Sequence, residues 1–170
     1  MDPLRMYVIP LKSLRNGIHH FNWELNHRFF EHFENSSLQK GTFQVEVVLD
    51  KQDDLSTLQM NIEGSYEANC DRCLAVIRIP VSGDYTLYVK TAEEEESDPS
   101  LLCIGPGELE LKLASVIYDY VCISLPISQT IECDKLEDPP CDREVLKRIQ
   151  LNDEPSDTSA WDVLKNFEQT

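Results

Sequence analysis

The 170-residue chain is poor in glycine and lacks the glycine-rich motifs that hold phosphates. It has six glycines, and no G-x-G-x-x-G, G-x-x-x-x-G-K-[ST] or G-x-S-x-G pattern occurs in it. The Gly105-Pro106-Gly107 sequence is interpreted as a corner between a strand and a helix. The acidic residues fall in loop-like runs, whereas metal-dependent phosphoryl chemistry needs carboxylates gathered around a cleft. We therefore expect a protein that is not an enzyme and has no small-molecule substrate.

Long apolar runs are also missing from the sequence. No segment approaches the roughly 20 apolar residues that a membrane helix needs, and the start at residues 1–5 lacks the basic and apolar regions of a secretory signal. We expect a cytoplasmic protein that does not associate with membranes. In that reducing compartment the six cysteines are expected to be thiols or metal ligands rather than disulfides.

Positive charge is scarce and unevenly placed. The chain has 15 lysines and arginines against 31 acidic residues, a net charge of -16. Residues 1–40 nevertheless carry one more base than acid, so all of the negative excess lies after them. Phosphate backbones are bound mainly by Lys and Arg. Any RNA contact is therefore expected at Arg5, Lys12, Arg15 and Arg28, while a basic protein would suit the acidic remainder.

Alternating apolar residues predict a series of β-strands. A strand is expected over 42–49, with one face formed by Phe43, Val45, Val47 and Leu49. A second alternating segment covers 55–66, and its strand is expected to end at Gly64. Pro80 and Gly83 predict a bend or bulge midway along a third, over 74–89. Shorter strands are expected at 7–11 and 101–104. Residues 19–33 fit both a helical spacing and a strand alternation, and we expect a strand to about Leu25. Successive strands with polar breaks indicate an antiparallel meander, partly barrel-like.

Helical spacing predicts one long helix over 108–124, with Glu108 and Glu110 in its first turn and Leu125-Pro126 ending it. Shorter helices are expected after Leu25, to about Phe33, and over 142–151. The fold class is therefore α+β. Residues 1–126 would form the core domain, 127–158 an acidic polar linker, and 159–170 a short helix. That last helix carries Trp161, Leu164 and Phe167 at intervals of three and would dock on its own core or on a partner.

The cysteine pair Cys70/Cys73 stands between two expected strands. Two cysteines separated by two residues in a turn can present both sulfurs to one metal ion, and Cys133 and Cys141 could complete an all-thiolate zinc site. The seven residues between Cys133 and Cys141 exceed the usual spacing. The alternative is a pair of thiols packed at a turn. Cys103 and Cys122 lie in apolar runs and are expected in the core.

The order of these features resembles the YceD family, the large ribosomal RNA subunit accumulation proteins of bacteria and plastids. The resemblance rests on Cys70-Asp71-Arg72-Cys73-Leu74, on Ile123-Ser124-Leu125-Pro126 after a helix, and on Trp161-x-x-Leu164. It departs at Thr158-Ser159-Ala160, where the family usually has an Asp-Pro-Arg-like tripeptide.

The resemblance implies a role in making or stabilising large-subunit ribosomal RNA, with ribosomal RNA or ribosome-assembly proteins as partners. It supplies no catalytic residues. Arg72, Trp161 and Leu164 are the motif residues that we expect to contact RNA or a partner. The competing hypothesis is a zinc-stabilised adaptor for protein interactions unrelated to ribosomes.

Overall fold

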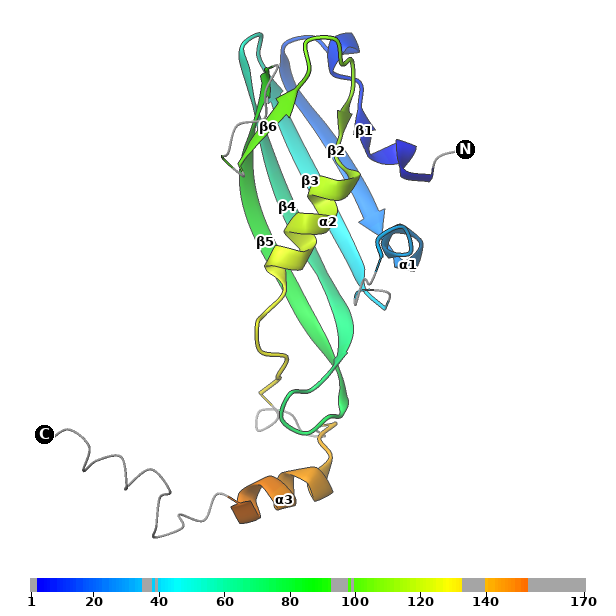
Figure 1. The fold of residues 1–170 in the computed structure, drawn as a ribbon, viewed down its shortest axis with the longest axis vertical. Helices are drawn as coiled ribbons and strands as arrows, with labels where there is room; N and C mark the ends of the chain where they lie inside the picture. Colours follow the sequence, from blue (N-terminus) through cyan, green and yellow to red (C-terminus); the bar gives the residue numbers. More distant parts are fainter. Residues whose placement is uncertain are drawn as a thin grey trace, which may run out of the picture.

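The fold is built on an open five-stranded sheet (Figure 1). In this computed structural model the described residues are 3–34, 38, 40–92, 98, 100–132 and 140–152. The sheet order is β2-β3-β4-β5-β6, and β2 and β6 form its two edges, so the sheet is not a closed barrel. The bounds of its strands are β2 Gly17–Leu25, β3 Thr42–Lys51, β4 Leu55–Asn69, β5 Val76–Thr91 and β6 Leu101–Ile104.

Strand alternation creates one apolar face on this sheet. The four apolar residues predicted to share a face of β3 are all fully buried, as are Leu58 and Ile62 of β4. Their neighbours along each strand are mostly polar and exposed on the other face. Because successive side chains point to opposite faces, the sequence pattern placed this core correctly.

The meander is antiparallel from β2 to β5, as predicted, but β6 runs parallel to β5. For two neighbouring strands to run parallel, the chain must turn back after the first strand before the second one begins. Here it turns back only as far as the level of Tyr88, because β6 pairs with Tyr88–Thr91, the last residues of β5. The result is a mixed sheet rather than a pure antiparallel meander.

Of the bend or bulge predicted at Pro80 and Gly83, the bulge is absent, and the predicted end of β4 at Gly64 is wrong. The β4–β5 register pairs every residue from Leu55↔Lys90 to Asn69↔Val76 without a skipped position. At Pro80, β5 pairs with β4 on one side and with no described strand on the other, so a missing N–H is tolerated. At Gly83, an added Cβ would lie 2.6 Å from Ser124 Oγ, so glycine there permits close packing of the following helix.

The long helix predicted over 108–124 is also wrong in its first third. Helix α2 spans Ala114–Ser124, and Leu111–Lys112 instead forms β7, which pairs with β1 (Val8–Ile9). Lys12 N–H donates to Leu109 O at 3.2 Å, and Leu113 N–H donates to Tyr7 O at 3.0 Å. These backbone bonds outweigh helical propensity, and Glu108 and Glu110 lie exposed outside the helix.

Helix α2 lies across the apolar face of the sheet (Figure 1). Its Ile117 and Val121 are fully buried. Tyr85 of β5 and Ser124 share a hydrogen bond of 2.8 Å between Oη and Oγ, which fixes the end of the helix to the sheet. The chain leaves α2 at Leu125-Pro126, as predicted.

The first helix, α1, is shorter than expected, spanning His27–Phe30. Asn26 caps it by accepting the Arg28 N–H at its side-chain oxygen, 3.0 Å away. The chain enters β1 and leaves it through two 3₁₀ turns, η1 (Pro3–Tyr7) and η2 (Leu11–Ser13). No helix among the described residues is long and apolar enough to cross a bilayer.

Strands β4 and β5 continue past the end of β3 as a two-stranded ribbon, residues 66–79, which we call the arm. The last β3–β4 pair is Thr42↔Ser65, and beyond it β4 pairs with β5 alone. From α2 the chain descends along the arm to its end, where helix α3 (Arg143–Asn152) lies (Figure 1). This helix confirms the prediction over 142–151.

Two other predictions lie outside the described residues. They are the terminal helix with Trp161 and Leu164, and most of the acidic loop between β5 and β6. The division into a core, a linker and a terminal helix stays a prediction.

Candidate functional site: the cysteine turn at the end of the arm

The cysteine pair forms the turn that joins β4 to β5. Cys70 N–H donates to Ala75 O at 2.8 Å, and Leu74 N–H donates to Cys70 O at 2.9 Å. Leu74 has φ of 61°, the left-handed conformation that closes the turn. Both cysteines are buried, and neither is in a disulfide. The turn therefore holds two reduced sulfurs at the far end of the molecule.

The segment after α2 is tied to this turn by two hydrogen bonds. Asp71 N–H donates to Gln129 O at 3.0 Å, and Gln129 N–H donates to Asp71 Oδ2 at 2.6 Å. Ile131 and Cys141 then pack against the core cluster that includes Cys70 and Cys73. The chain thus returns a third cysteine to the first pair from about seventy positions away in the sequence.

The sulfur of Cys73 is the centre of this arrangement. Its pKa is lowered, first by the Ala75 N–H, which donates to the sulfur, against an opposing effect of burial. The Asp142 N–H and the thiols of Cys70 and Cys141 also donate to it. Backbone N–H groups aimed at a sulfur favour its thiolate form, which is the form that binds metals.

The structure brings three of the four predicted metal ligands together. The fourth, Cys133, lies outside the described residues. Within the described ranges, no set of three or more His, Cys, Asp and Glu side chains is arranged to hold a metal ion. The contacts around Cys73 are consistent with a thiolate site, while the described residues alone do not form one.

Tyr66 lies on the arm, four residues before Cys70. Its side chain is 2% exposed, and among the described residues its hydroxyl is the buried side-chain oxygen without a hydrogen-bond partner. Burial raises its pKa, and the charge of Asp71 raises it further. The hydroxyl is thus kept protonated within the arm.

The predicted RNA-contacting residues do not form one patch. Lys12 and Arg15 lie on or just after η2, near the end of the molecule that carries Asp53, where Asn16 donates to Asp53 Oδ1 at 2.8 Å. Arg5 is on η1 and Arg28 on α1. All four are exposed, and Arg72 is exposed at the arm end, the opposite end of the molecule (Figure 1).

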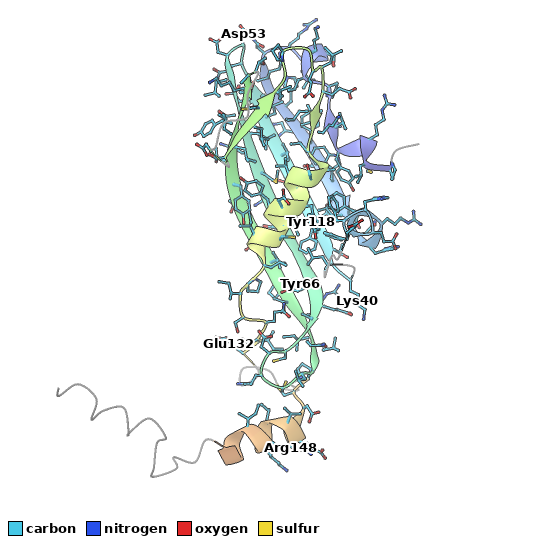
Figure 2. The ribbon with its side chains drawn as sticks, in the orientation of Figure 1. Lys40, Asp53, Tyr66, Tyr118, Glu132 and Arg148 are labelled. Carbon is cyan, nitrogen blue, oxygen red and sulfur yellow. The ribbon has the colours of Figure 1, made fainter. Side chains whose placement is uncertain are left out.

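Sequence reasoning missed the basic residues of α3. Arg143, Lys147 and Arg148 are exposed on this helix, and Figure 2 shows Arg148 at the opposite end of the molecule from Asp53. Their helix was predicted, but its charges were included in the acidic total for residues 41–170. Counting charge helix by helix would have found them.

A hollow of about 450 Å³ between β6, β7 and α2 contains none of the predicted site residues. Asp98, Glu108 and Glu110 line it together with a single base, Lys112. An excess of carboxylates disfavours phosphate ligands there. Cys103 also lines the hollow and is half-buried.

Cys122 on α2 is half-buried too, and burial raises the pKa of its thiol. Both cysteines were predicted to lie in the core, and both are less buried than core residues.

The amino-acid sequence was compared with models of known protein families, and one family matches it. Residues 58–168 match the family model described as "Large ribosomal RNA subunit accumulation protein YceD". No curated protein and no solved structure matches the chain. The matched segment begins in β4 and contains the whole arm, the cysteine turn, α2 and α3. It covers well over half of the residues, and the chain belongs to the YceD family.

Proposed function

We propose that this protein is a non-enzymatic factor in ribosome biogenesis, needed for large-subunit ribosomal RNA to accumulate. The observation that carries the proposal is the family match, which spans the arm and its cysteine turn. The protein would act by contacting ribosomal RNA or ribosome-assembly proteins. Its exposed arm and strongly negative body suit a binding role better than a buried reaction site.

Depleting the protein in its own cells is expected to lower large-subunit ribosomal RNA relative to small-subunit RNA. Quantifying both RNAs by gel or sequencing, before and after depletion, checks this. Supplying the wild-type chain from a second copy should restore the ratio. An unchanged ratio in depleted cells would reject the ribosomal role and favour the adaptor hypothesis.

A zinc ion at the cysteine turn is a second proposal, favoured by the contacts that Cys73 makes with Cys70 and Cys141. These residues, with Cys133 as the expected fourth ligand, would hold the ion as thiolates. Zinc bound by four thiolates stabilises a fold without taking part in chemistry. It would fasten α3 and the preceding segment to the arm.

Protein purified under reducing conditions is expected to contain about one zinc per chain, the stoichiometry of a single four-thiolate site. Cys73→Ser should lose it, because serine supplies no thiolate. Elemental analysis by mass spectrometry measures the content, and Cys122→Ser, on α2 away from the turn, is the matched control that should keep it. Zinc-free wild-type protein, or equal zinc in both variants, would contradict the proposal.

A further inference from the structure

Leu74 closes the turn at the end of the arm with its backbone, but its side chain is not part of the core. Its side chain is 68% exposed, so it adds little to the buried apolar surface. Its φ of 61° is a conformation that glycine or asparagine adopts at lower cost than leucine. Two residues on, Val76 is 60% exposed. A strained and exposed apolar residue at an extremity indicates a contact surface.

Exposed bases lie at the same end of the molecule as this apolar pair. Arg72 lies in the same turn, and α3 brings Arg143, Lys147 and Arg148 to the same end (Figure 2). Arg143 and Lys147 are four residues apart, so they project from the same side of the helix one turn from each other. The arm end therefore carries guanidinium and ammonium groups as well as an exposed apolar tip.

The acids at this end are partly occupied by backbone N–H groups. Asp142 Oδ1 accepts from Glu144 N at 2.9 Å and from Val145 N at 3.2 Å, while Asp71 Oδ2 accepts from Gln129 N. With Glu132 and Glu144, the described residues of the arm end carry four acids against four bases. The described residues of this end are therefore balanced in charge, in a chain whose net charge is -16.

We propose that the arm end is an RNA-binding surface. Arg72 and the three bases of α3 contact phosphates, and Leu74 and Val76 pack against an unpaired base. Phosphates take most protein–nucleic-acid hydrogen bonds, and RNA is commonly read at unstacked bases. The acidic body repels the phosphate backbone, so RNA meets the arm end first. This inference rests on the proposed function and names its RNA contact.

Binding of the full-length protein to a fluorescently labelled single-stranded RNA of mixed sequence tests the charges. Fluorescence anisotropy is measured at several salt concentrations. The triple variant Arg143→Glu, Lys147→Glu, Arg148→Glu should weaken binding about tenfold or more and flatten its salt dependence, because each lost phosphate contact removes part of the slope. The matched control Lys51→Glu, Lys90→Glu, Lys112→Glu makes the same charge change away from the arm end and should shift affinity about threefold at most. Equal losses in both triples, or no RNA binding by the wild type, would overturn the proposal.

Leu74→Gly tests the apolar contact while relieving the left-handed strain. It should keep or raise the melting temperature and keep the zinc content of the wild type. RNA affinity should fall about three- to tenfold, with an unchanged salt slope, since no charge is removed. Wild-type affinity in this variant would overturn the role of Leu74.

The outcomes separate this inference from the proposed function. If depletion lowers large-subunit RNA but the α3 triple binds the RNA probe like the wild type, the RNA surface is wrong and the cellular role stands. If the α3 triple instead loses a ribosome-assembly protein while keeping RNA affinity, the partner is protein and the inference fails. If RNA binding behaves as proposed but depletion has no effect, the cellular role fails alone.

Discussion

Phe30→Ala is expected to lower the free energy of unfolding by about 3–5 kcal/mol, the usual cost of emptying a large aromatic site in a core. Phe30 is fully buried on α1, a helix of only four residues. Its ring centroid lies 5.2 Å from that of Phe29, 5.6 Å from Phe43 of β3 and 6.5 Å from Tyr118 of α2. The Phe30 ring therefore packs between α1, α2 and the sheet. Its removal leaves a cavity and takes away the ring contacts of Phe29, Phe43 and Tyr118.

Urea denaturation followed by circular dichroism measures the effect, with Phe33→Ala as the matched control. Phe33 is half-buried and stacks on Tyr118 at 4.0 Å with an interplanar angle of 2°. Removing it exposes less new surface, so a loss of about 1–2 kcal/mol is expected. Equal losses in the two variants would show that Phe30 is not the central contact.

Gly64→Ala is expected to destabilise the fold by about 3 kcal/mol, at the upper end of the range for overpacking. Gly64 lies opposite Phe43 in the β3–β4 register. A Cβ there would meet the Thr42 carbonyl oxygen, Phe43 Cδ1 at 2.5 Å and Phe43 Cα at 2.8 Å. Two of these atoms are backbone and cannot rotate away, so β3 and β4 would have to separate.

The control for this substitution is Gly107→Ala. A Cβ at Gly107 has no atom within 4 Å, and the residue is exposed between β6 and β7. The free energy of unfolding should change by about 0.5 kcal/mol or less. A tolerated Gly64→Ala would mean that β3 and β4 are less tightly paired beside Phe43 than the structure shows.

The fold was predictable where a simple alternation repeats over many residues. Strands β3, β4 and β5 are such cases, and their buried faces follow directly from the sequence. The segment from Leu109 to Leu113 was not predictable, because Leu109 and Leu113, four residues apart, continue the helical spacing of the true helix that follows. The pairing of β7 with β1 decided the outcome, and it joins residues about a hundred positions apart.

The candidate site was predictable in its first half only. The spacing of Cys70 and Cys73 indicated a turn that presents two sulfurs, and the structure has one. Cys141 could be proposed as a ligand but not placed, because its position depends on the bonds between Asp71 and Gln129. The exposure and backbone strain of Leu74 had no signal in the sequence, since both are properties of the folded turn.

The arm has a consequence for how the protein opens. A two-stranded ribbon is marginally stable by itself, and beyond the Thr42↔Ser65 pair no third strand supports it among the described residues. The stability of the arm then depends on the chain segment after α2, which is bonded to Asp71, and on the hydrogen bonds to the Cys73 sulfur. The amides of Tyr66 to Asn69 should consequently exchange with solvent through a local opening, at a lower free energy than those of β3. The arm can thus unfold and refold while the rest of the sheet stays folded.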